Sequence, residues 1–267
     1  MADLFFKHPE LPFVECRYST KSERHFKPHL HKAFCIGAIV QGEVIYRVGT
    51  KQIRLQPGTL ALINPETLHS CNPTEFNKRS YYMLFLDIPW CLQLQRSLWE
   101  IETFSPVNTI FLEDVSIYRQ TIHTMKSLMD DGDILEKEQL LIELLEKLFL
   151  WVCEPAAEKK ELCLPIKQLK RLLSENLEKD LSMSRIAIKL NANPTTLLRQ
   201  FKAATGITPH AYRLNCKIEL AKRLLQKGID IAQVALECGF FDQSHFHRHF
   251  KSMTTVTPKR YQVNFVQ

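Results

Sequence analysis

An internal repeat in the last third of the chain restricts its fold more than any other feature. Several residues recur at a constant spacing of 49 positions. The recurring pairs are Arg199 and Arg248, Phe201-Lys202 and Phe250-Lys251, Ile207-Thr208-Pro209 and Val256-Thr257-Pro258, and Tyr212 and Tyr261. Agreement at one spacing over so many positions indicates a duplicated supersecondary unit. We therefore predict two copies of one unit, at about 181–202 and 231–251.

The first copy has the pattern of two short helices joined by a turn. Ile186 and Ala187 share an apolar face, and the small side chain of Ala187 permits close approach by a neighbouring helix. Pro194 suits the first position of the second helix, where its missing N–H costs nothing. Leu197 and Phe201 are four residues apart and face inward. The other side chains of this helix face solvent or a DNA groove, and they are Thr195, Leu198, Arg199 and Lys202.

The second copy follows the same plan with more polar groups on its second helix. Gly239 ends the first helix at a position that calls for a positive φ, and Asp242 is the expected N-cap of the second helix. Phe246 and Phe250 anchor that helix. Its other side carries Gln243, Ser244, His247, Arg248 and Lys251. Arginine pairs with guanine and glutamine with adenine in the major groove, so this helix-turn-helix layout predicts binding to double-stranded DNA.

Charge is distributed unevenly along the chain. From residue 163 onward 17 Lys and Arg stand against 7 Asp and Glu, whereas the preceding residues carry 18 against 22. A basic module joined to a mildly acidic one fits a nucleic-acid binder with a separate control domain. The alternative, an all-helical interaction domain without DNA, is disfavoured by the repeat and by the arginine on each second helix. A helix over 211–226, which carries Arg213, Lys217, Lys222 and Arg223, would hold the two copies a fixed distance apart.

The C-terminal module resembles one family closely. The segment 234–251, VALECGFFDQSHFHRHFK, followed by Thr-Pro and Tyr261, is similar to the signature of the AraC/XylS family of bacterial transcription regulators. The resemblance covers the whole module and implies sequence-specific DNA binding. Two positions depart from the family pattern, because Thr255 stands where glycine is usual and Gln262 where arginine is frequent, although Gly206 keeps the glycine in the first copy. Both lie beyond the second helix of the second copy, so we expect altered loop geometry rather than lost DNA binding.

Residues 11 to about 112 have the pattern of an antiparallel β domain. Runs rich in branched and aromatic residues, such as 35–40, 43–48 and 81–86, are separated by turn signals that contain Gly, Pro or Asn. Many short strands at this spacing indicate a barrel or a sandwich. The predicted fold class is therefore α+β with two domains: an antiparallel, cupin-like β-barrel with C-terminal helices, and then an all-α tandem helix-turn-helix domain.

Two amphipathic helices are expected between the strands and the repeat, at about 115–152. The apolar residues of the second step by three or four positions, as in Leu141, Leu144, Leu145, Leu148 and Val152. Leu140, Ile142, Phe149, Leu150 and Trp151 widen its apolar face, so it packs within the domain or forms the seam of a homodimer. The polar segment 154–163 is the expected linker between an effector-binding and dimerisation domain at 1–153 and the DNA-binding domain at 164–267.

The N-terminal domain resembles the cupin-type sensing domain of many AraC/XylS members. The resemblance rests on His29, His31, Gly42, the segment LQPGTLALINP at 55–65, and His69. Histidines on strands can point into a barrel mouth, which is a common small-molecule site. The resemblance implies that a small-molecule effector enters this pocket. The candidate pocket residues are Arg17, His29, His31, Tyr46, His69, Asn72 and Tyr82.

A metal in this pocket is an alternative that the residues only partly support. Cupin enzymes hold a metal with an HxH pair, an acid shortly after it and a third histidine. Here no acid follows His31 before Glu43, although Cys35 and Cys71 lie near enough in sequence to substitute. The regulators that this chain resembles bind an effector without metal, so we expect a dry or ligand-filled pocket and no cofactor.

A second group of histidines lies on the second reading helix, at His245, His247 and His249. His247 faces away from the other two, and no fourth ligand is evident. We therefore expect no zinc there and interpret His247 as a donor that faces the groove.

Several other classes of protein are excluded by composition. No stretch approaches the ~20 apolar residues of a membrane span, the first residues lack the pattern of a secretory signal, and the eight cysteines form no CxxC pair and are expected to be reduced. We therefore expect a non-enzymatic, cytoplasmic regulator that binds double-stranded DNA, a small-molecule effector and, if it activates, RNA polymerase. The rivals are a cupin metalloenzyme fused to a DNA-binding module and a regulator that needs no ligand.

Overall fold

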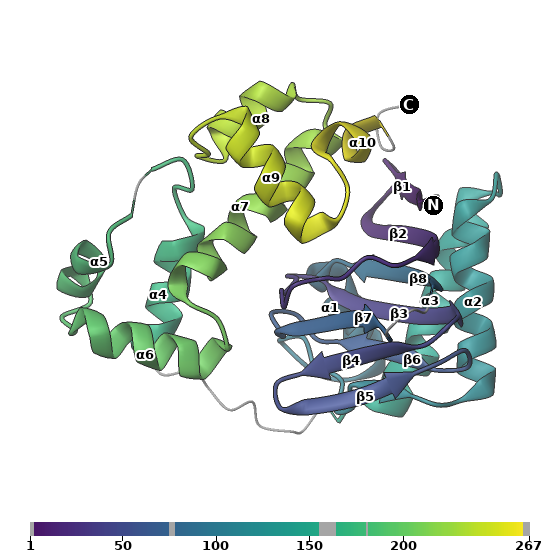
Figure 1. Ribbon diagram of the computed structural model, residues 1–267. Coiled ribbons are helices and arrows are strands. Elements are labelled where there is room, and N and C mark those ends of the chain that lie inside the picture. Colours follow the sequence, from purple (N-terminus) through teal and green to yellow (C-terminus); the bar gives the residue numbers. More distant parts are fainter. Residues whose placement is uncertain (1–2, 75–77, 155–163, 180, 264–267) are drawn as a thin grey trace. The chain divides into compact units, whose positions relative to one another are not determined.

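The computed structural model describes residues 3–74, 78–154, 164–179 and 181–263, which form two compact units divided between Ala157 and Glu158 (Figure 1). The first unit is a β domain with helices and the second is entirely helical. Most of the predicted linker, from 155 to 163, lies outside the described residues. No helix of the described part is both long and apolar enough to cross a membrane.

The strands of the first unit pair into two antiparallel sheets (Figure 1). The larger has the order β1 (Asp3–His8), β2 (Leu11–Ser22), β8 (Arg79–Leu86), β3 (Phe34–Gln41), β6 (Leu60–Ile63) and β9 (Phe111–Leu112). The smaller has the order β5 (Lys51–Leu55), β4 (Val44–Val48) and β7 (His69–Pro73). The predicted antiparallel β domain is thus confirmed, with its strands divided between two sheets.

The larger sheet has an apolar core on each of its faces. Phe34 and Ile36 of β3 belong to a core shared with the helices, whereas Cys35 and Ile39 belong to a core shared with the smaller sheet. This alternation follows from the two-residue period of a strand. The helices that cover the first face are α1 (Ile88–Leu98), α2 (Val115–Met129) and α3 (Ile134–Val152).

Helix α3 buries the apolar face that the sequence predicts. The five residues of the three-and-four pattern are all buried, as is Phe149. Asp133 caps the helix by accepting hydrogen bonds from the backbone of Leu135 and Glu136. Leu150 and Trp151, however, stay about 60% exposed at its C-terminal end. The wide apolar face is therefore only partly used within the unit.

The second unit contains the two predicted copies of a helix-turn-helix. The first consists of α5 (Met183–Lys189) and α6 (Pro194–Thr205), and the second of α8 (Ile231–Glu237) and α9 (Gln243–Thr254). Helix α7 (Pro209–Gln226) joins them, α4 (Leu164–Ser174) precedes the first copy, and α10 (Pro258–Val263) follows the second. The all-α C-terminal domain predicted from the repeat is confirmed.

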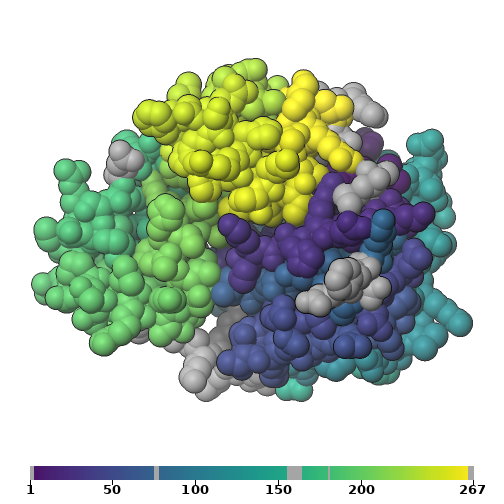
Figure 2. Space-filling view, in the orientation of Figure 1, coloured from purple at the N-terminus to yellow at the C-terminus, as the bar shows by residue number. Residues whose placement is uncertain are grey.

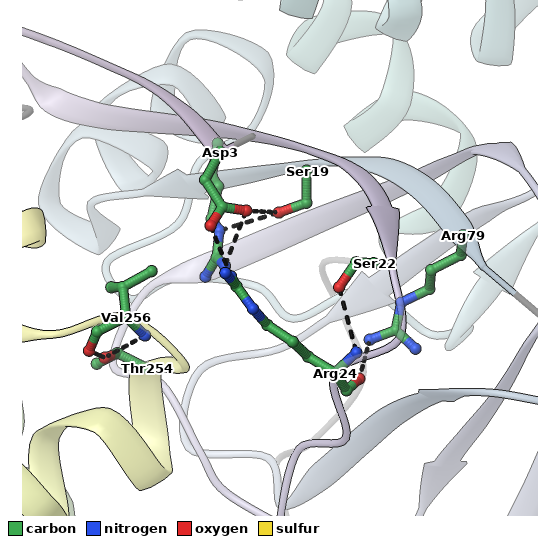
Figure 3. A network of polar contacts seen from close by, with 8 residues as sticks. Asp3, Ser19, Ser22, Arg24, Arg79, Thr254 and Val256 are labelled. Carbon is green, nitrogen blue, oxygen red and sulfur yellow. Dashed lines mark hydrogen bonds and ion pairs between the residues drawn. The ribbon is translucent and has the colours of Figure 1, made fainter. Parts of the chain in front are cut away.

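The turns that end α6 and α9 have the same geometry. Thr254 Oγ1 donates to the carbonyl of Val256 at 3.0 Å, and Thr205 Oγ1 donates to the carbonyl of Ile207 at 3.1 Å (Figure 3 shows the second turn). The next residue is left-handed in both copies, with φ of 79° at Gly206 and 65° at Thr255. The expectation that Thr255 alters the loop is therefore wrong, because threonine adopts the conformation that glycine has in the first copy.

A side chain in this conformation carries strain that glycine would relieve. The left-handed region costs an L-residue roughly 1–2 kcal/mol. Glycine avoids this cost, but it loses more conformational entropy on folding, which offsets part of the gain. We expect Thr255→Gly to be more stable than Thr255→Ala by about 1 kcal/mol in urea unfolding of the full chain. Comparison of the two variants cancels whatever the threonine side chain contributes by itself. Equal stability of the two would show that the turn holds no backbone strain.

Candidate DNA-reading helices and sensor pocket

Helix α6 is started by local capping. The side chain of Asn193 accepts hydrogen bonds from the backbone N–H of Thr195 at 3.0 Å and of Thr196 at 3.1 Å, and Pro194 occupies the first turn as predicted. Leu197 and Phe201 are buried beneath the helix. The helix therefore has a fixed start and a fixed inward face, which leaves its opposite face to solvent.

Helix α9 is started in the same way. Asp242 caps it by accepting from the backbone N–H of His245 at 2.6 Å, which confirms the predicted N-cap. Gly239 has the predicted positive φ, 67°, and a Cβ there would lie 2.4 Å from the carbonyl oxygen of Leu177. Only glycine fits this position, because both the conformation and the close backbone exclude a side chain. Phe246 and Phe250 are fully buried under the helix.

All nine predicted DNA contacts are exposed side chains. They are Thr195, Leu198, Arg199 and Lys202 on α6, and Gln243, Ser244, His247, Arg248 and Lys251 on α9. The atoms of α9 and α10, yellow in the space-filling view, lie at the surface (Figure 2). The two helices thus present the polar faces that the sequence predicts.

The other two histidines of α9 face the protein. The rings of His245 and His249 lie 4.6 Å apart, and both contact the buried ring of Phe240. His247 is exposed, as expected from its place on the helix. Of the three histidines, only His247 is therefore placed to meet a groove.

A surface hollow at the start of α9 contains a residue that sequence reasoning missed. The hollow measures about 510 Å³ and is lined by Phe241, Asp242, Ser244, His245 and Arg248. Phe241 is 90% exposed, although its neighbour Phe240 is buried. A doubled phenylalanine before an N-cap gives no indication of which ring is buried, so the sequence could not single out Phe241.

Helix α7 uses two of its basic residues internally. The Arg213 side chain is buried and donates to backbone carbonyls at the end of α4 and after it, and Lys217 donates to the carbonyl of Gly239 and lies over the ring of Phe240 at 5.4 Å. Of the four basic residues that the sequence places on this helix, only Arg223 is exposed, so the helix is mainly a brace.

The β domain brings three predicted pocket histidines together. One ring nitrogen of each histidine lies within 4.8 Å of one ring nitrogen of each of the other two. The ring centroids are 4.8 Å apart for His29 and His31, 4.6 Å for His29 and His69, and 5.2 Å for His31 and His69. Backbone bonds between His29 and His69, of 3.0 and 2.9 Å, hold two of these residues side by side. His69 thus shares one site with two histidines that precede it by 38 and 40 positions in the sequence.

His69 is the most buried member of this cluster, with 2% of its surface exposed. Burial lowers the pKa of His69 well below its usual value of 6.5, and the neighbouring His29 and His31 lower it further. The ring is therefore neutral at physiological pH. Tyr46, whose ring lies 6.4 Å from that of His69, donates its hydroxyl to the carbonyl of Leu62 at 3.0 Å.

The three remaining candidates do not join this cluster. Tyr82 belongs to the core on the helix-covered face of the larger sheet and stacks on Tyr18 at 4.3 Å. Arg17 is ion-paired with Asp3, and Asn72 holds the backbone of Phe26 with two hydrogen bonds. The seven residues therefore form no single pocket, because strand parity and local pairing direct these three side chains elsewhere.

The cysteines considered as substitute ligands do not join the histidines either. The group of metal-capable side chains found among the described residues contains the three histidines and no cysteine. Burial raises the pKa of Cys71 to about 11, so its thiol stays protonated. Cys35 donates to the carbonyl of Ala33.

A shallow hollow on the smaller sheet is a further feature that the sequence did not indicate. It measures about 570 Å³ and is lined by His25, Glu43, Ile45, Arg47, Arg54, Asn72, Pro73 and Thr74. Arg54 and Glu43 form an exposed ion pair at 3.5 Å, and Arg47 donates a hydrogen bond to the side chain of Gln52 at 2.8 Å.

Comparison with known proteins agrees with both units. Residues 12–145 match the AraC-like ligand binding domain, and residues 186–264 match a helix-turn-helix domain. The HTH-type transcriptional regulator YbfI of Bacillus subtilis is 28% identical over 82% of this chain and 81% of its own length. The transcriptional regulator LumQ of Photobacterium leiognathi is 25% identical over 93% of this chain and 95% of its own.

Solved structures agree with the two-domain fold. An apo variant of ToxT from Vibrio cholerae covers 95% of this chain and 98% of its own, with a TM-score of 0.67 and 13% identity. ToxT with a bound unsaturated fatty acid covers 95% of each chain, with a TM-score of 0.62 and 16% identity. The predicted fold, DNA-binding function and non-enzymatic character are confirmed by the matched families. With the ligand-binding model spanning half of its length, this chain belongs to the AraC family of transcriptional regulators.

Proposed function

We propose that α6 and α9 enter two segments of the major groove and read the operator. Nine residues would make the contacts: Thr195, Leu198, Arg199, Lys202, Gln243, Ser244, His247, Arg248 and Lys251. Their exposure on two capped and internally anchored helices supports this, because a recognition helix must present a fixed outward face to read base edges. The internal packing of α7 favours a fixed spacing between the two helices.

The two helices differ in what they can read. Helix α9 offers Gln243, Ser244, His247 and Arg248, whereas Arg199 is the main base-reading donor of α6. We therefore propose an asymmetric operator in which the α9 side receives more hydrogen bonds to base edges. Lys202 and Lys251 would contact phosphates, since each lies toward the end of its helix and lysine acts there as a point charge.

The test of this assignment is arginine removal. Arg199→Ala and Arg248→Ala should each weaken binding to the natural operator by about 1–3 kcal/mol and relax the preference at one base position. Arg223→Ala, an exposed change of the same charge on α7, should leave sequence preference intact. Binding to operator and to scrambled DNA is measured for each variant by fluorescence anisotropy. Unchanged operator affinity in both reading-helix variants would refute the assignment.

We assign the β domain to 1–153, the linker to 154–163 and the DNA-binding domain to 164–267. The β domain is proposed to bind a small-molecule effector beside His29, His31, His69 and Tyr46. The effector acts only through its different affinity for two arrangements of the protein. ToxT, which has a similar fold, binds an unsaturated fatty acid, so carboxylated lipids belong in the first ligand set. A thermal-shift screen in which no small molecule moves the transition would favour the regulator without a ligand.

The exposed C-terminal end of α3 suggests a second copy of this chain as a partner. Leu150 and Trp151 are about 60% exposed at the end of α3, and these side chains suit a homodimer seam formed by the helices at 115–152. Sedimentation equilibrium of wild type and Trp151→Glu measures the monomer–dimer equilibrium of each protein. A chromosomal regulator of this kind would act in the cytoplasm, and as an activator it would also contact RNA polymerase.

A further inference from the structure

We propose that His29, His31 and His69 form a binding site for a divalent first-row transition-metal ion inside the β domain. The proposal is separate from DNA reading and does not depend on it. It starts from the three ring nitrogens within 4.8 Å of one another. Three further observations, on the proton positions, on an unsatisfied nitrogen and on the backbone, point to the same ligand.

The hydrogen bonds of two rings fix the position of the proton on each ring. His29 Nδ1 lies 2.7 Å from the carbonyl oxygen of Lys27, and His69 Nδ1 lies 2.9 Å from that of Thr67. A carbonyl only accepts, so Nδ1 carries the proton in each ring and Nε2 keeps its lone pair. A metal-bound histidine commonly donates its other ring N–H to a backbone carbonyl, and this hydrogen bond sets the tautomer and orients the ring.

The Nε2 atom of His69 has no hydrogen-bond partner among the described residues, although the side chain is almost completely buried. A buried acceptor without a hydrogen-bond partner destabilises the fold, because it has lost its bonds to water. Imidazole nitrogen is a good ligand for zinc, copper, nickel and iron. A bound metal ion would satisfy this atom with the same lone pair that is otherwise left without a partner.

The backbone holds the ligands on a prepared frame. Reciprocal bonds between His29 and His69 fix two of them, and the carbonyl of His31 accepts from the N–H of Glu66 at 2.6 Å. Zinc–nitrogen bonds of ~2.0–2.1 Å in a tetrahedron place the nitrogens roughly 3.4 Å apart. The present separations therefore need only small ring rotations to close around an ion.

The donor set selects the kind of metal. Three neutral imidazoles favour zinc and its late first-row neighbours over magnesium or calcium, which prefer oxygen ligands. The group contains no fourth protein donor in the described part of the chain, so water or a bound ligand completes the coordination sphere. The rings of Phe26 and Phe85, at 5.8 and 5.2 Å from His29 and His31, give the site apolar walls.

Metal binding by the untagged full-length chain tests the site directly. Protein freed of metal with a chelator is titrated with Zn²⁺ by calorimetry and with Co²⁺ by visible absorption, which reports tetrahedral nitrogen ligation. We expect one ion of each metal per chain at micromolar concentration, and His69→Gln or His31→Gln should weaken binding ~100-fold or more. The variants are checked for native circular dichroism, and Zn²⁺ should raise the Tm of wild type but not that of His31→Gln or His69→Gln.

Two control variants separate this site from other histidines. His25→Gln removes an exposed histidine of the same domain, and His245→Gln disrupts the histidine pair on α9. Both should bind Zn²⁺ as wild type does. Binding that is lost in His245→Gln but kept in His69→Gln, or that is weaker than millimolar in wild type, would overturn the proposal. Neither result touches the DNA-reading assignment, because no DNA is present in the titration.

Discussion

Replacing Arg213 with methionine should destabilise the C-terminal unit by about 3–5 kcal/mol, because it removes a buried cation that donates hydrogen bonds to four backbone carbonyls. The side chain is buried on α7, and methionine keeps its apolar stem. Its guanidinium donates to the backbone carbonyls of Leu173 at 3.1 Å, Glu175 at 3.3 Å, Asn176 at 2.8 Å and Lys179 at 2.6 Å.

These carbonyls belong to the end of α4 and the turn that follows it. Helix ends leave carbonyls without internal partners, and a cation there also meets the negative end of the helix dipole. Arg213 therefore ties α4 to α7 beneath the first helix-turn-helix. Loss of the side chain should loosen that unit and weaken DNA binding, even though Arg213 reaches no groove.

Urea unfolding of the full chain, followed by circular dichroism, measures the effect. Arg223→Met is the matched control, since it changes the same residue type on the same helix at an exposed position, and it should shift stability by no more than about 0.5 kcal/mol. Similar unfolding curves for the Arg213 and Arg223 variants would mean that the buried guanidinium of Arg213 does not stabilise the C-terminal unit.

Replacing Asp3 with asparagine should destabilise the β domain by a comparable amount, about 3–5 kcal/mol. The carboxylate of Asp3 is fully buried and lies 3.3 Å from Arg17, 2.6 Å from Arg24 and 2.6 Å from the hydroxyl of Ser19 (Figure 3). Asparagine would leave two nearly buried guanidinium groups without their counter-charge. Strand β1 would then lose its side-chain bonds to Arg17 and Ser19 of β2, although the backbone pairing of the two strands remains.

The same carboxylate makes stability depend on pH. Burial by itself raises the pKa of Asp3, but the charges of Arg17 and Arg24 and the bond from Ser19 outweigh it and hold the pKa below the usual 3.8. The stabilisation is therefore complete above pH 3.8 and is lost as the pH falls through the lower folded-state value. Asp3→Asn should flatten the fall in stability below pH 4, whereas the exposed change Glu10→Gln should keep the wild-type slope. An unchanged acid slope in Asp3→Asn would contradict the assignment.

The helical half was predictable because its signals are local. The first-turn proline at Pro194, the cap at Asp242, the positive φ of Gly239 and the inward phenylalanines lie within a few residues of the elements they shape. Thr255 shows the limit of such reasoning, since the surrounding turn forces a conformation that the residue itself disfavours.

The β domain was less predictable because its contacts are between distant segments. Alternate residues of β8 point to opposite faces of the sheet, and Tyr82 points to the face that the helices cover. The sequence shows this alternation but not which of the two faces the helices cover. The partner of Arg17 is Asp3, which no spacing rule identifies. The histidines were found by residue type, whereas their closeness depends on the pairing of His29 with His69.

Hydroxyl-radical footprinting on the natural operator tests whether two unequal helices read one site. We expect protection over two successive major-groove segments. Arg199→Ala should weaken protection chiefly in one segment and Arg248→Ala chiefly in the other. Protection of a single segment, equally sensitive to both substitutions, would show that one of the two units is a brace and not a reader.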